Sequence, residues 1–351
     1  MRNWLVPACL CLLMSVSLTT LHSLAPDLLF KQIGFWAVGW VIFFLTSKIP
    51  FNHWLKLSRV GLIGLIILLT MVLFTAETRE TARWFHIFGF SLQPSQLALP
   101  VLSLFSAATI SRSHLKYSSR FWTYLALLAL PLLLIFIEPD LGTVIVIVAT
   151  LGLSLFLCGL NGLTVRKLSL MGLVILGIGW LILQPYQKAR LTGFLEGNDY
   201  LSDTNYNATQ ALISIGAGGL MGRGVGLGSQ SQLKFLPEKQ TDFIFAAIAE
   251  ETGLIGTTLL LIIYFSLIWF LLSQTKYLSL PGQILSVSLA VWLLLQTSIN
   301  IGMNLGLMPI TGLTLPFVSY GGSSLLSSLW WLGLSKSATE ASFLKSQLHL
   351  S

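Results

Sequence analysis

Asp242 lies in a stretch whose residue types could carry acid–base chemistry. It follows Glu238 and Lys239, and it directly precedes a strongly apolar run that begins at Phe243. A carboxylate at the edge of a low-dielectric region has a raised pKa and accepts a proton more readily than one in water. The same position also suits a helix cap, so both roles for Asp242 stay open.

Other polar groups also border apolar runs. Asp140 precedes such a run and could cap a helix, while Lys188 and Arg190 follow another, where they could bind an anion or simply reach the membrane interface. The glycine-rich segment, residues 216–228, could cradle phosphate oxygens with its backbone amides, or it could serve turns and close helix packing. It has no P-loop ending, which argues against a nucleotide-binding fold.

Residues 300–312 and 316–324 place amides, hydroxyls, glycines and prolines where an apolar run should continue. Interrupted helices at membrane depth are tolerated where they line a cavity or are buried in protein. We therefore expect a polar cavity that opens away from the cytoplasm.

The composition indicates that these residues belong to a membrane protein. Of 351 residues, 54% are hydrophobic and only 9% are charged, against roughly 25% charged in an ordinary soluble domain. This excludes a soluble globule and predicts an all-α polytopic membrane protein with about ten transmembrane helices. The expected spans are residues 4–22, 28–47, 60–76, 95–111, 121–138, 141–159, 167–185, 253–273, 283–305 and 321–340.

We expect one integral membrane domain over residues 1–351, with a long structured loop, residues 186–252, between spans seven and eight. Lys and Arg collect in the short connections on one side, which places the N- and C-termini in the cytoplasm and the loop outside. The basic residues that give the net charge of +7 do not cluster, so no nucleic-acid partner is indicated.

A polar cluster outside the cytoplasm has no access to ATP. A synthesis there needs a substrate that is already activated and presented by the membrane, and a polyprenyl-pyrophosphate sugar meets both needs. A transporter with a polar core fits the composition equally well.

Several short motifs follow one another along the chain: Arg83-Trp84, Gln93-Pro-Ser95, Pro139-Asp-Leu-Gly-Thr143, Tyr186-Gln187 with Arg190, Tyr206 with Gln210, Phe235-Leu-Pro-Glu238, Thr241-Asp-Phe-Ile-Phe245 and Pro316-Phe-Val-Ser-Tyr-Gly-Gly-Ser-Ser324. In these motifs the chain resembles the SEDS family (shape, elongation, division and sporulation), the RodA and FtsW group of peptidoglycan glycosyltransferases, from about Phe30 to Ser337. The stretch from Gln230 to Glu238 is more similar to RodA than to FtsW, which favours wall elongation over division.

The resemblance implies a multi-pass protein of the bacterial cytoplasmic membrane that takes lipid II, an undecaprenyl-pyrophosphate disaccharide peptide, as substrate. It implies a class B penicillin-binding protein as partner, and Asp242 as the catalytic residue with its site outside the cytoplasm. Substrate-binding roles are expected for Arg83, Trp84, Gln93, Ser95, Asp140, Tyr186, Arg190, Gln210, Glu238, Lys239, Thr241, Ser319, Tyr320 and Ser323.

The chain departs from the family pattern at several positions. Gln96 and Leu99 stand where a Glu and a Lys are usual, Gln240 replaces a common His, and Glu80-Thr81 replaces a usual Gly-Ala. The loss of both the Glu and the Lys removes an opposite-charge pair together and leaves no single buried charge behind.

The implied reaction inverts an α-linked pyrophosphate into a β-1,4 glycosidic bond, for which one carboxylate base suffices. The sequence indicates no definite cofactor. Arg190 and Lys239, or a divalent cation such as Mg²⁺ or Mn²⁺, would offset the charge of the leaving group. The alternatives are a lipid II flippase, a division-type polymerase of the FtsW kind, and an inactive scaffold for a penicillin-binding protein.

Overall fold

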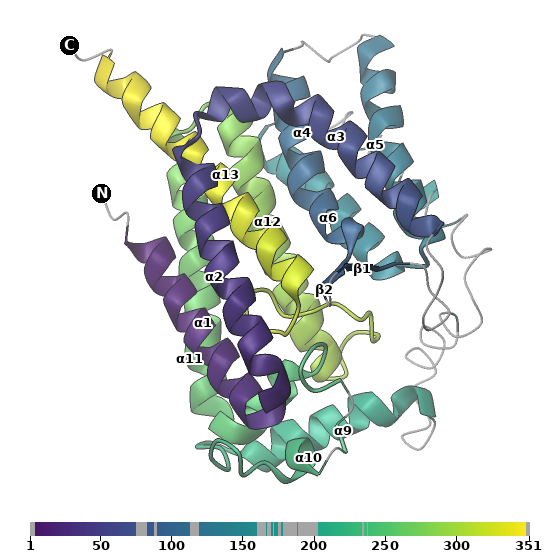
Figure 1. The fold of residues 1–351 in the computed structure, drawn as a ribbon, viewed down its shortest axis with the longest axis vertical. Helices are drawn as coiled ribbons and strands as arrows, with labels where there is room; N and C mark the ends of the chain where they lie inside the picture. Colours follow the sequence, from purple (N-terminus) through teal and green to yellow (C-terminus); the bar gives the residue numbers. More distant parts are fainter. Residues whose placement is uncertain are drawn as a thin grey trace. The chain divides into compact units, whose positions relative to one another are not determined.

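The computed structural model describes residues 4–74, 83–87, 90–112, 119–159, 166, 170, 172–174, 177, 188, 203–233, 235–236 and 238–348 (Figure 1). The chain forms two compact units. Unit 1 comprises Met1–Trp36, Ile182–Phe270 and Leu293–Gly321, and unit 2 comprises Ala37–Leu181, Leu271–Trp292 and Gly322–Ser351.

Almost all of the described structure is helical, which confirms the predicted all-α class. The elements in chain order are α1 (Leu5–Leu24), α2 (Pro26–Lys48), α3 (Phe51–Leu73), β1 (Phe85–Ile87), β2 (Phe90–Leu92), the 3₁₀ helix η1 (Pro94–Leu97), α4 (Ala98–Arg112), α5 (Ser119–Ile137), α6 (Leu141–Leu157), α9 (Asp203–Gly218), α10 (Ser229–Gln232), α11 (Ile244–Gln274), the 3₁₀ helix η2 (Thr275–Tyr277), α12 (Leu280–Asn304) and α13 (Gly322–Leu348). The two strands form one antiparallel hairpin in which Phe85 pairs with Leu92.

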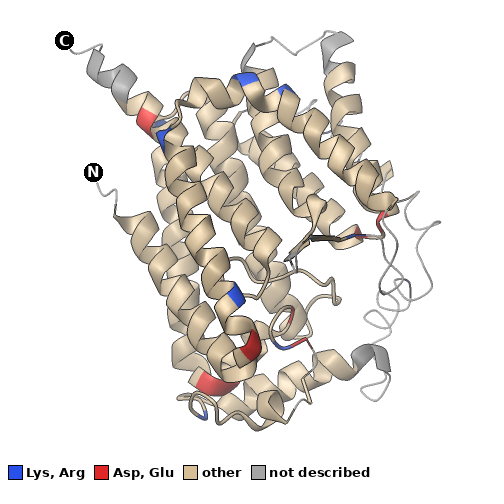
Figure 2. Ribbon diagram, viewed as in Figure 1, with Lys and Arg blue, Asp and Glu red and all other residues tan. Residues whose placement is uncertain are grey.

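Several helices are long and apolar enough to cross a membrane. Within the described residues these are α1, α2, α3, α11 with η2, and α12, and three shorter apolar helices cover Pro94–Ile110, Trp122–Ile137 and Leu141–Leu157. The middle turns of α6 and α12 carry no charged residue (Figure 2). The protein is therefore a multi-pass membrane protein, while the count of ten spans stays a prediction, because span 167–185 falls almost entirely outside the described residues.

Two helices begin earlier in the chain than the hydropathy predicts. α3 begins directly after Pro50 and includes Lys56 and Arg59, because long basic side chains can reach the interface without ending a helix. α11 begins at Ile244, so residues 244–252, which the expected loop included, form its first turns. The helix bends at Gly253, whose φ of 67° is accessible to glycine but strained for other residues.

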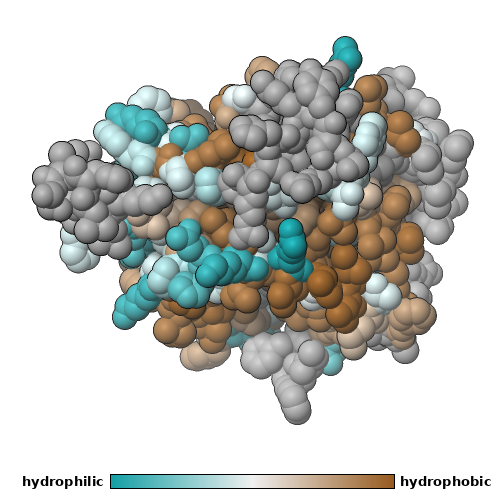
Figure 3. Space-filling model, turned by 90° about the horizontal axis from the view of Figure 1, so that it is seen from above, coloured by the Kyte–Doolittle hydropathy of each residue, from teal (hydrophilic) through white to brown (hydrophobic). Residues whose placement is uncertain are grey.

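Large apolar side chains are exposed on the helix surfaces. Phe265 and Trp269 on α11 are 66% and 65% exposed and stack on each other. On the face seen in Figure 3, apolar side chains form a broad area beside polar ones. A surface of this kind is compatible with lipid and unfavourable in water.

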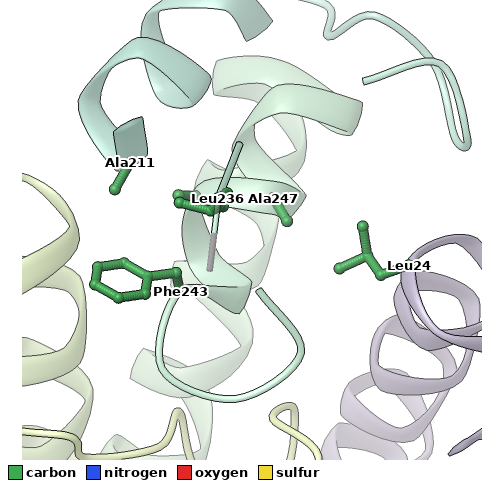
Figure 4. Packing of buried hydrophobic residues seen from close by; sticks show 6 residues of the cluster. Leu24, Ala211, Leu236, Phe243 and Ala247 are labelled. Carbon is green, nitrogen blue, oxygen red and sulfur yellow. The ribbon is translucent and has the colours of Figure 1, made fainter. Parts of the chain in front are cut away.

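Unit 1 has a small buried apolar cluster. It joins Leu24 at the end of α1, Ala211 of α9, Leu236, and Phe243 with Ala246 and Ala247 at the start of α11 (Figure 4). The cluster therefore anchors both ends of the segment that carries Asp242.

Unit 2 is held by close helix contacts and buried hydroxyl pairs. Ser288 of α12 donates to Ser154 of α6 at 2.9 Å, and Ser286 of α12 pairs with Ser335 of α13 at 2.7 Å. A Cβ at Gly333 of α13 would lie 2.9 Å from the backbone oxygen of Phe43, so α2 and α13 approach closely there. Small residues and interhelical hydrogen bonds are the usual means of helix association in membranes.

Candidate active site

In unit 1, residues 238–243 form a tight turn in front of α11. The backbone oxygen of Glu238 accepts from the N–H groups of Thr241 at 3.1 Å and Phe243 at 3.3 Å. The Thr241 hydroxyl lies 3.2 Å from Oε2 of Glu238, and Glu238 has a positive φ of 46°. The turn therefore brings Glu238, Thr241 and Asp242 together.

Each of three successive backbone carbonyls in this turn accepts a hydrogen bond from another part of unit 1. The N–H of Tyr320 donates to the oxygen of Gln240 at 2.9 Å, and the hydroxyl of Ser319 donates to the oxygen of Thr241 at 2.6 Å. The next oxygen, that of Asp242, accepts from the side-chain amides of Asn300 and Asn304 on α12. Three successive carbonyls thus have different donors, which fixes the orientation of the turn.

Two asparagines one helical turn apart on α12 hold the backbone of Asp242. Nδ2 of Asn300 lies 3.0 Å and Nδ2 of Asn304 lies 3.1 Å from the Asp242 oxygen. Oδ1 of Asn304 also accepts from the N–H of Ala246 at 3.1 Å, in the first turn of α11. This N–H is therefore capped by an amide from α12 and not by the carboxylate of Asp242.

The carboxylate of Asp242 faces the segment that follows α12. A Cβ built on Gly312 would lie 3.7 Å from Oδ2 of Asp242, and Gly312 has a φ of +74°. The side chain is only partly buried. Because Gly312 has no side chain, it leaves space beside the Asp242 carboxylate for a substrate hydroxyl.

Residues 305–321 are non-helical between α12 and α13, as predicted for this polar stretch. Their backbone oxygens accept from buried side chains: Ser17 donates to Val318 at 2.7 Å, Gln296 to Thr314 at 2.9 Å, and Tyr264 to Pro316. Irregular backbone at membrane depth needs such partners. Hydrogen bonds from buried side chains thus fix this segment, which also contacts the Asp242 turn through Ser319.

Two buried carboxylates on α11 bind the glycine-rich segment and α10, which directly follows it. Glu250, which is 0% exposed, accepts from the N–H groups of Gln230 at 2.8 Å and Ser231 at 3.0 Å. Glu251 accepts from the N–H of Gly226 at 3.0 Å. The amide of Gly226 in the segment, and those of Gln230 and Ser231 after it, therefore bind the protein's own carboxylates in the way that they would bind phosphate oxygens.

The alternative of close packing is confirmed for these glycines. A Cβ at Gly222 would collide with the backbone of Glu251, and one at Gly253 would collide with Gly222. The N–H of Gly224 donates to the oxygen of Glu251 at 2.9 Å. The segment is packed directly against the bend of α11.

Lys239 and Gln210 lie in the same unit. The ammonium of Lys239 donates to the backbone oxygen of Ser231 in α10. Gln210 is half-buried in α9, where its backbone oxygen accepts from the Ser214 hydroxyl at 2.8 Å. Lys239 therefore ties the turn to α10 as well as carrying the charge expected to meet pyrophosphate.

A second group of expected site residues lies in unit 2. Gln93 joins two of them, because its Nε2 lies 3.3 Å from Oδ2 of Asp140 and its N–H donates to the Ser323 hydroxyl at 2.9 Å. Oδ1 of Asp140 accepts from the N–H of Thr143 at 3.3 Å, so the cap predicted for Asp140 is confirmed. Ser95, two residues after Gln93, is buried, and its hydroxyl has no hydrogen-bond partner among the described residues.

Arg83 braces the connection between α5 and α6. Its guanidinium donates to the backbone oxygens of Glu138 and Pro139, and Pro139 has an unusual φ of +28°. Trp84, the next residue, is 40% exposed. Arg83 thus supports a strained turn at the point where Asp140 begins α6.

Glu138 in this connection is buried and unpaired. Its side chain is 1% exposed, and neither carboxylate oxygen has a hydrogen-bond partner among the described residues. Burial, followed by the charge of Asp140, raises the pKa of Glu138 to about 8, although Arg83 opposes the shift. The group is therefore mostly protonated at neutral pH.

The positions that depart from the family pattern are accommodated. Gln96 donates from Nε2 to Oε1 of Gln93 at 3.3 Å, and its backbone oxygen accepts from Ser327 at 2.6 Å. Leu99 is 7% exposed. A neutral hydrogen bond and an apolar contact therefore occupy the places of the usual charged pair.

Some expected residues cannot be placed, and others were not expected. Tyr186, Arg190 and the pair Glu80-Thr81 lie outside the described residues. Asn300 and Asn304 were noted only as polar interruptions, although their i, i+4 spacing puts both on one helix face. Across the part of the chain that is described, no three His, Cys, Asp or Glu side chains group closely enough to hold a metal ion.

The chain is similar to known proteins along most of its length. Residues 3–342 match the model of the family described as "Cell cycle protein", which groups FtsW, RodA and SpoVE. The probable peptidoglycan glycosyltransferase FtsW of Pseudoalteromonas translucida is 37% identical over 305 residues, covering 83% of this chain and 75% of that protein. The peptidoglycan glycosyltransferase MrdB of Escherichia coli K12 is 34% identical over 314 residues, covering 87% and 83%.

Solved structures show the same similarity. A chain from work on polymerization and crosslinking by a peptidoglycan synthase complex matches with a TM-score of 0.80 and 29% identity, covering 96% of this chain and 97% of that chain. The rod shape determining protein RodA of Thermus thermophilus matches with a TM-score of 0.71 and 28% identity, covering 96% of each chain.

Proposed function

Because the chain belongs to the FtsW, RodA and SpoVE family of cell cycle proteins and is a peptidoglycan glycosyltransferase, we propose that it polymerises lipid II with Asp242 as the general base. The observation that carries this proposal is the fixed turn in front of α11. Three successive backbone oxygens of this turn accept hydrogen bonds, and the Asp242 carboxylate lies next to Gly312.

In the proposed reaction, Asp242 accepts the proton of the acceptor's sugar hydroxyl. The hydroxyl oxygen forms a bond to the anomeric carbon of the donor, whose bond to the pyrophosphate oxygen breaks, and undecaprenyl pyrophosphate leaves with the electron pair. Attack opposite the leaving group inverts the α linkage to a β linkage, and no second carboxylate is needed as nucleophile. Positioned bases of this type contribute about 10²- to 10⁴-fold in rate.

Positive side chains are proposed to offset the charge of the departing pyrophosphate. Arg190 suits this role because its planar fork can meet two phosphate oxygens, and Lys239 supplies a second charge beside the turn. A divalent cation such as Mg²⁺ or Mn²⁺, held by one or two carboxylates and by the pyrophosphate itself, is the alternative carrier of this positive charge.

The remaining expected binding residues are proposed to hold lipid II. The polar group of unit 2, with Arg83, Gln93, Asp140 and Ser323, suits sugar hydroxyls and amides because its members are already hydrogen-bonded to one another or to the backbone beside them. We propose wall elongation as the process, from the similarity of the stretch 230–238 to RodA, with division as the alternative. A class B penicillin-binding protein is the proposed partner, since crosslinking needs a transpeptidase.

A reconstitution in liposomes tests this proposal against its rivals. The liposomes contain labelled lipid II, and glycan-strand formation and movement of lipid II across the bilayer are both measured. The proposal expects strands from the parent with its partner and none from Asp242→Asn. Lipid II movement without strands would support the flippase, and strand formation that needs only the partner would support the scaffold.

A further inference from the structure

Helices α3, α4 and α5 of unit 2 enclose a cavity of about 710 Å³ that no proposed catalytic residue lines. Its walls combine apolar side chains such as Leu62, Phe105 and Leu127 with polar ones. The polar lining is contributed by the first half of α3, the end of α4 and the start of α5. The volume lies within the range of about 300–1,000 Å³ that is usual for ligand pockets.

Arg59 is the charged residue of the lining. Its side chain is exposed, and its guanidinium has no ion pair or hydrogen bond to the residues that the structure describes. Lys56 precedes it by about one helical turn. Residues 28–76 and 81–137 contain no Asp or Glu at all. The three helices around the cavity thus carry basic residues and no acidic residue to balance them.

An apolar chamber with a cationic, polar rim fits a particular kind of molecule. Arg binds phosphate oxygens in a bidentate manner, and Thr109 and Thr123 line the same cavity. In a membrane protein, the molecule that joins a phosphate to a long apolar chain is a phospholipid. A zwitterionic lipid would bring an ammonium group to a surface that is already basic, so an anionic headgroup is favoured.

We propose that this cavity is a binding site for an anionic phospholipid, with the lipid phosphate on Arg59 and one acyl chain against Leu62, Phe105 and Leu127. The site lies in unit 2 and is independent of the proposed role of Asp242. Replacement of Arg59 is therefore expected to weaken lipid binding without removing any group that takes part in the glycosyl transfer.

Native mass spectrometry of the purified, delipidated protein tests the site with phosphatidylglycerol as probe. The parent should bind phosphatidylglycerol more tightly than phosphatidylcholine of the same chains. Arg59→Gln should weaken phosphatidylglycerol binding about tenfold, since one charge-assisted bond to phosphate is lost. Lys56→Gln is the matched control, because it removes the same charge from the same helix outside the cavity, and it should bind as the parent does.

Two further arms distinguish a bound phospholipid from a phosphate ion held by Arg59 alone. Ala108→Leu fills the apolar part while Arg59 remains, and it should also weaken phosphatidylglycerol binding. Inorganic phosphate in excess should leave the bound lipid in place. Equal binding by the parent and Arg59→Gln, equal binding of the two lipids, or displacement by inorganic phosphate would each overturn the proposal.

Discussion

Asn304 on α12 donates from its side-chain amide to the backbone oxygen of Asp242, and its own amide oxygen accepts from the N–H of Ala246. One side chain therefore fixes both the residue proposed as base and the first turn of the helix that follows it. This pair of bonds lets the turn in front of α11 hold a carboxylate in one place. It also makes Asn304 a positioning residue in the proposed mechanism.

Replacing Asn304 should lower both stability and turnover. In Asn304→Ala the N–H of Ala246 loses its partner, which costs about 1–3 kcal/mol for a buried donor. The proposed base then shifts, and a misplacement of about 1 Å can reduce the rate about 10²-fold. Thermal unfolding and single-turnover polymerisation measure the two effects, and Asn52→Ala, an exposed asparagine of α3, is the control. Parental turnover in a folded Asn304→Ala protein would contradict the positioning role.

The hydroxyl of Ser319 provides a second test of the turn. It accepts from the N–H of Leu315 at 2.8 Å and donates to the oxygen of Thr241 at 2.6 Å. Ser319→Ala should reduce the maximal rate about tenfold, because the turn then loses one of its supports. Ser266→Ala is matched to it, because that exposed hydroxyl bonds only within its own helix. Equal rates for the two variants would remove Ser319 from the site.

Glu250 should matter for the order of α10 and of the glycine-rich segment directly before it. Glu250→Ala leaves the N–H groups of Gln230 and Ser231 without acceptors, at a cost of about 1–3 kcal/mol each if they stay buried. We expect a lower melting temperature and faster proteolysis between residues 222 and 232. The control is Glu340→Ala, whose side chain is half-exposed and pairs with Lys336 at 3.8 Å. Unchanged proteolysis in Glu250→Ala would show that the carboxylate does not hold the segment.

The stability of the protein should depend on pH through Glu138. Burial raises its pKa to about 8 in the folded state, above the ordinary value of a carboxyl group. The folded state therefore binds the proton more strongly, and this contribution to stability is fully present near pH 4 and is lost as the pH rises toward 8. Glu138→Gln mimics the protonated form, so its melting temperature should fall less than that of the parent between pH 5 and pH 8. Parallel pH curves for the two proteins would be inconsistent with this pKa.

The sequence predicted the membrane class and most helix positions, because long apolar runs separated by charges are a strong signal. It was less successful at helix starts. Basic residues within the first turns of α3, and the carboxylates Glu250 and Glu251 within α11, do not end a helix when the charge can reach the interface or bind backbone amides.

The site was predictable in its residue types but not in its contacts. The turn 238–243 follows from local sequence, whereas its bonds to Asn300, Asn304 and Ser319 join residues about 60 to 80 positions apart. Such long-range pairs leave no local pattern. In the glycine-rich segment and in α10 after it, amides that would suit phosphate are bound instead by Glu251 and Glu250 from a later helix.

The most direct measurement of the central claim is the single-turnover rate of lipid II polymerisation by Asp242→Asn, with the partner protein present. Asn keeps the size and polarity of the side chain but cannot accept the proton, so the rate should fall by about 10²- to 10⁴-fold. Asp27→Asn, an exposed aspartate in the first turn of α2, should keep the parental rate. A parental rate in Asp242→Asn would contradict the assignment of Asp242 as the base.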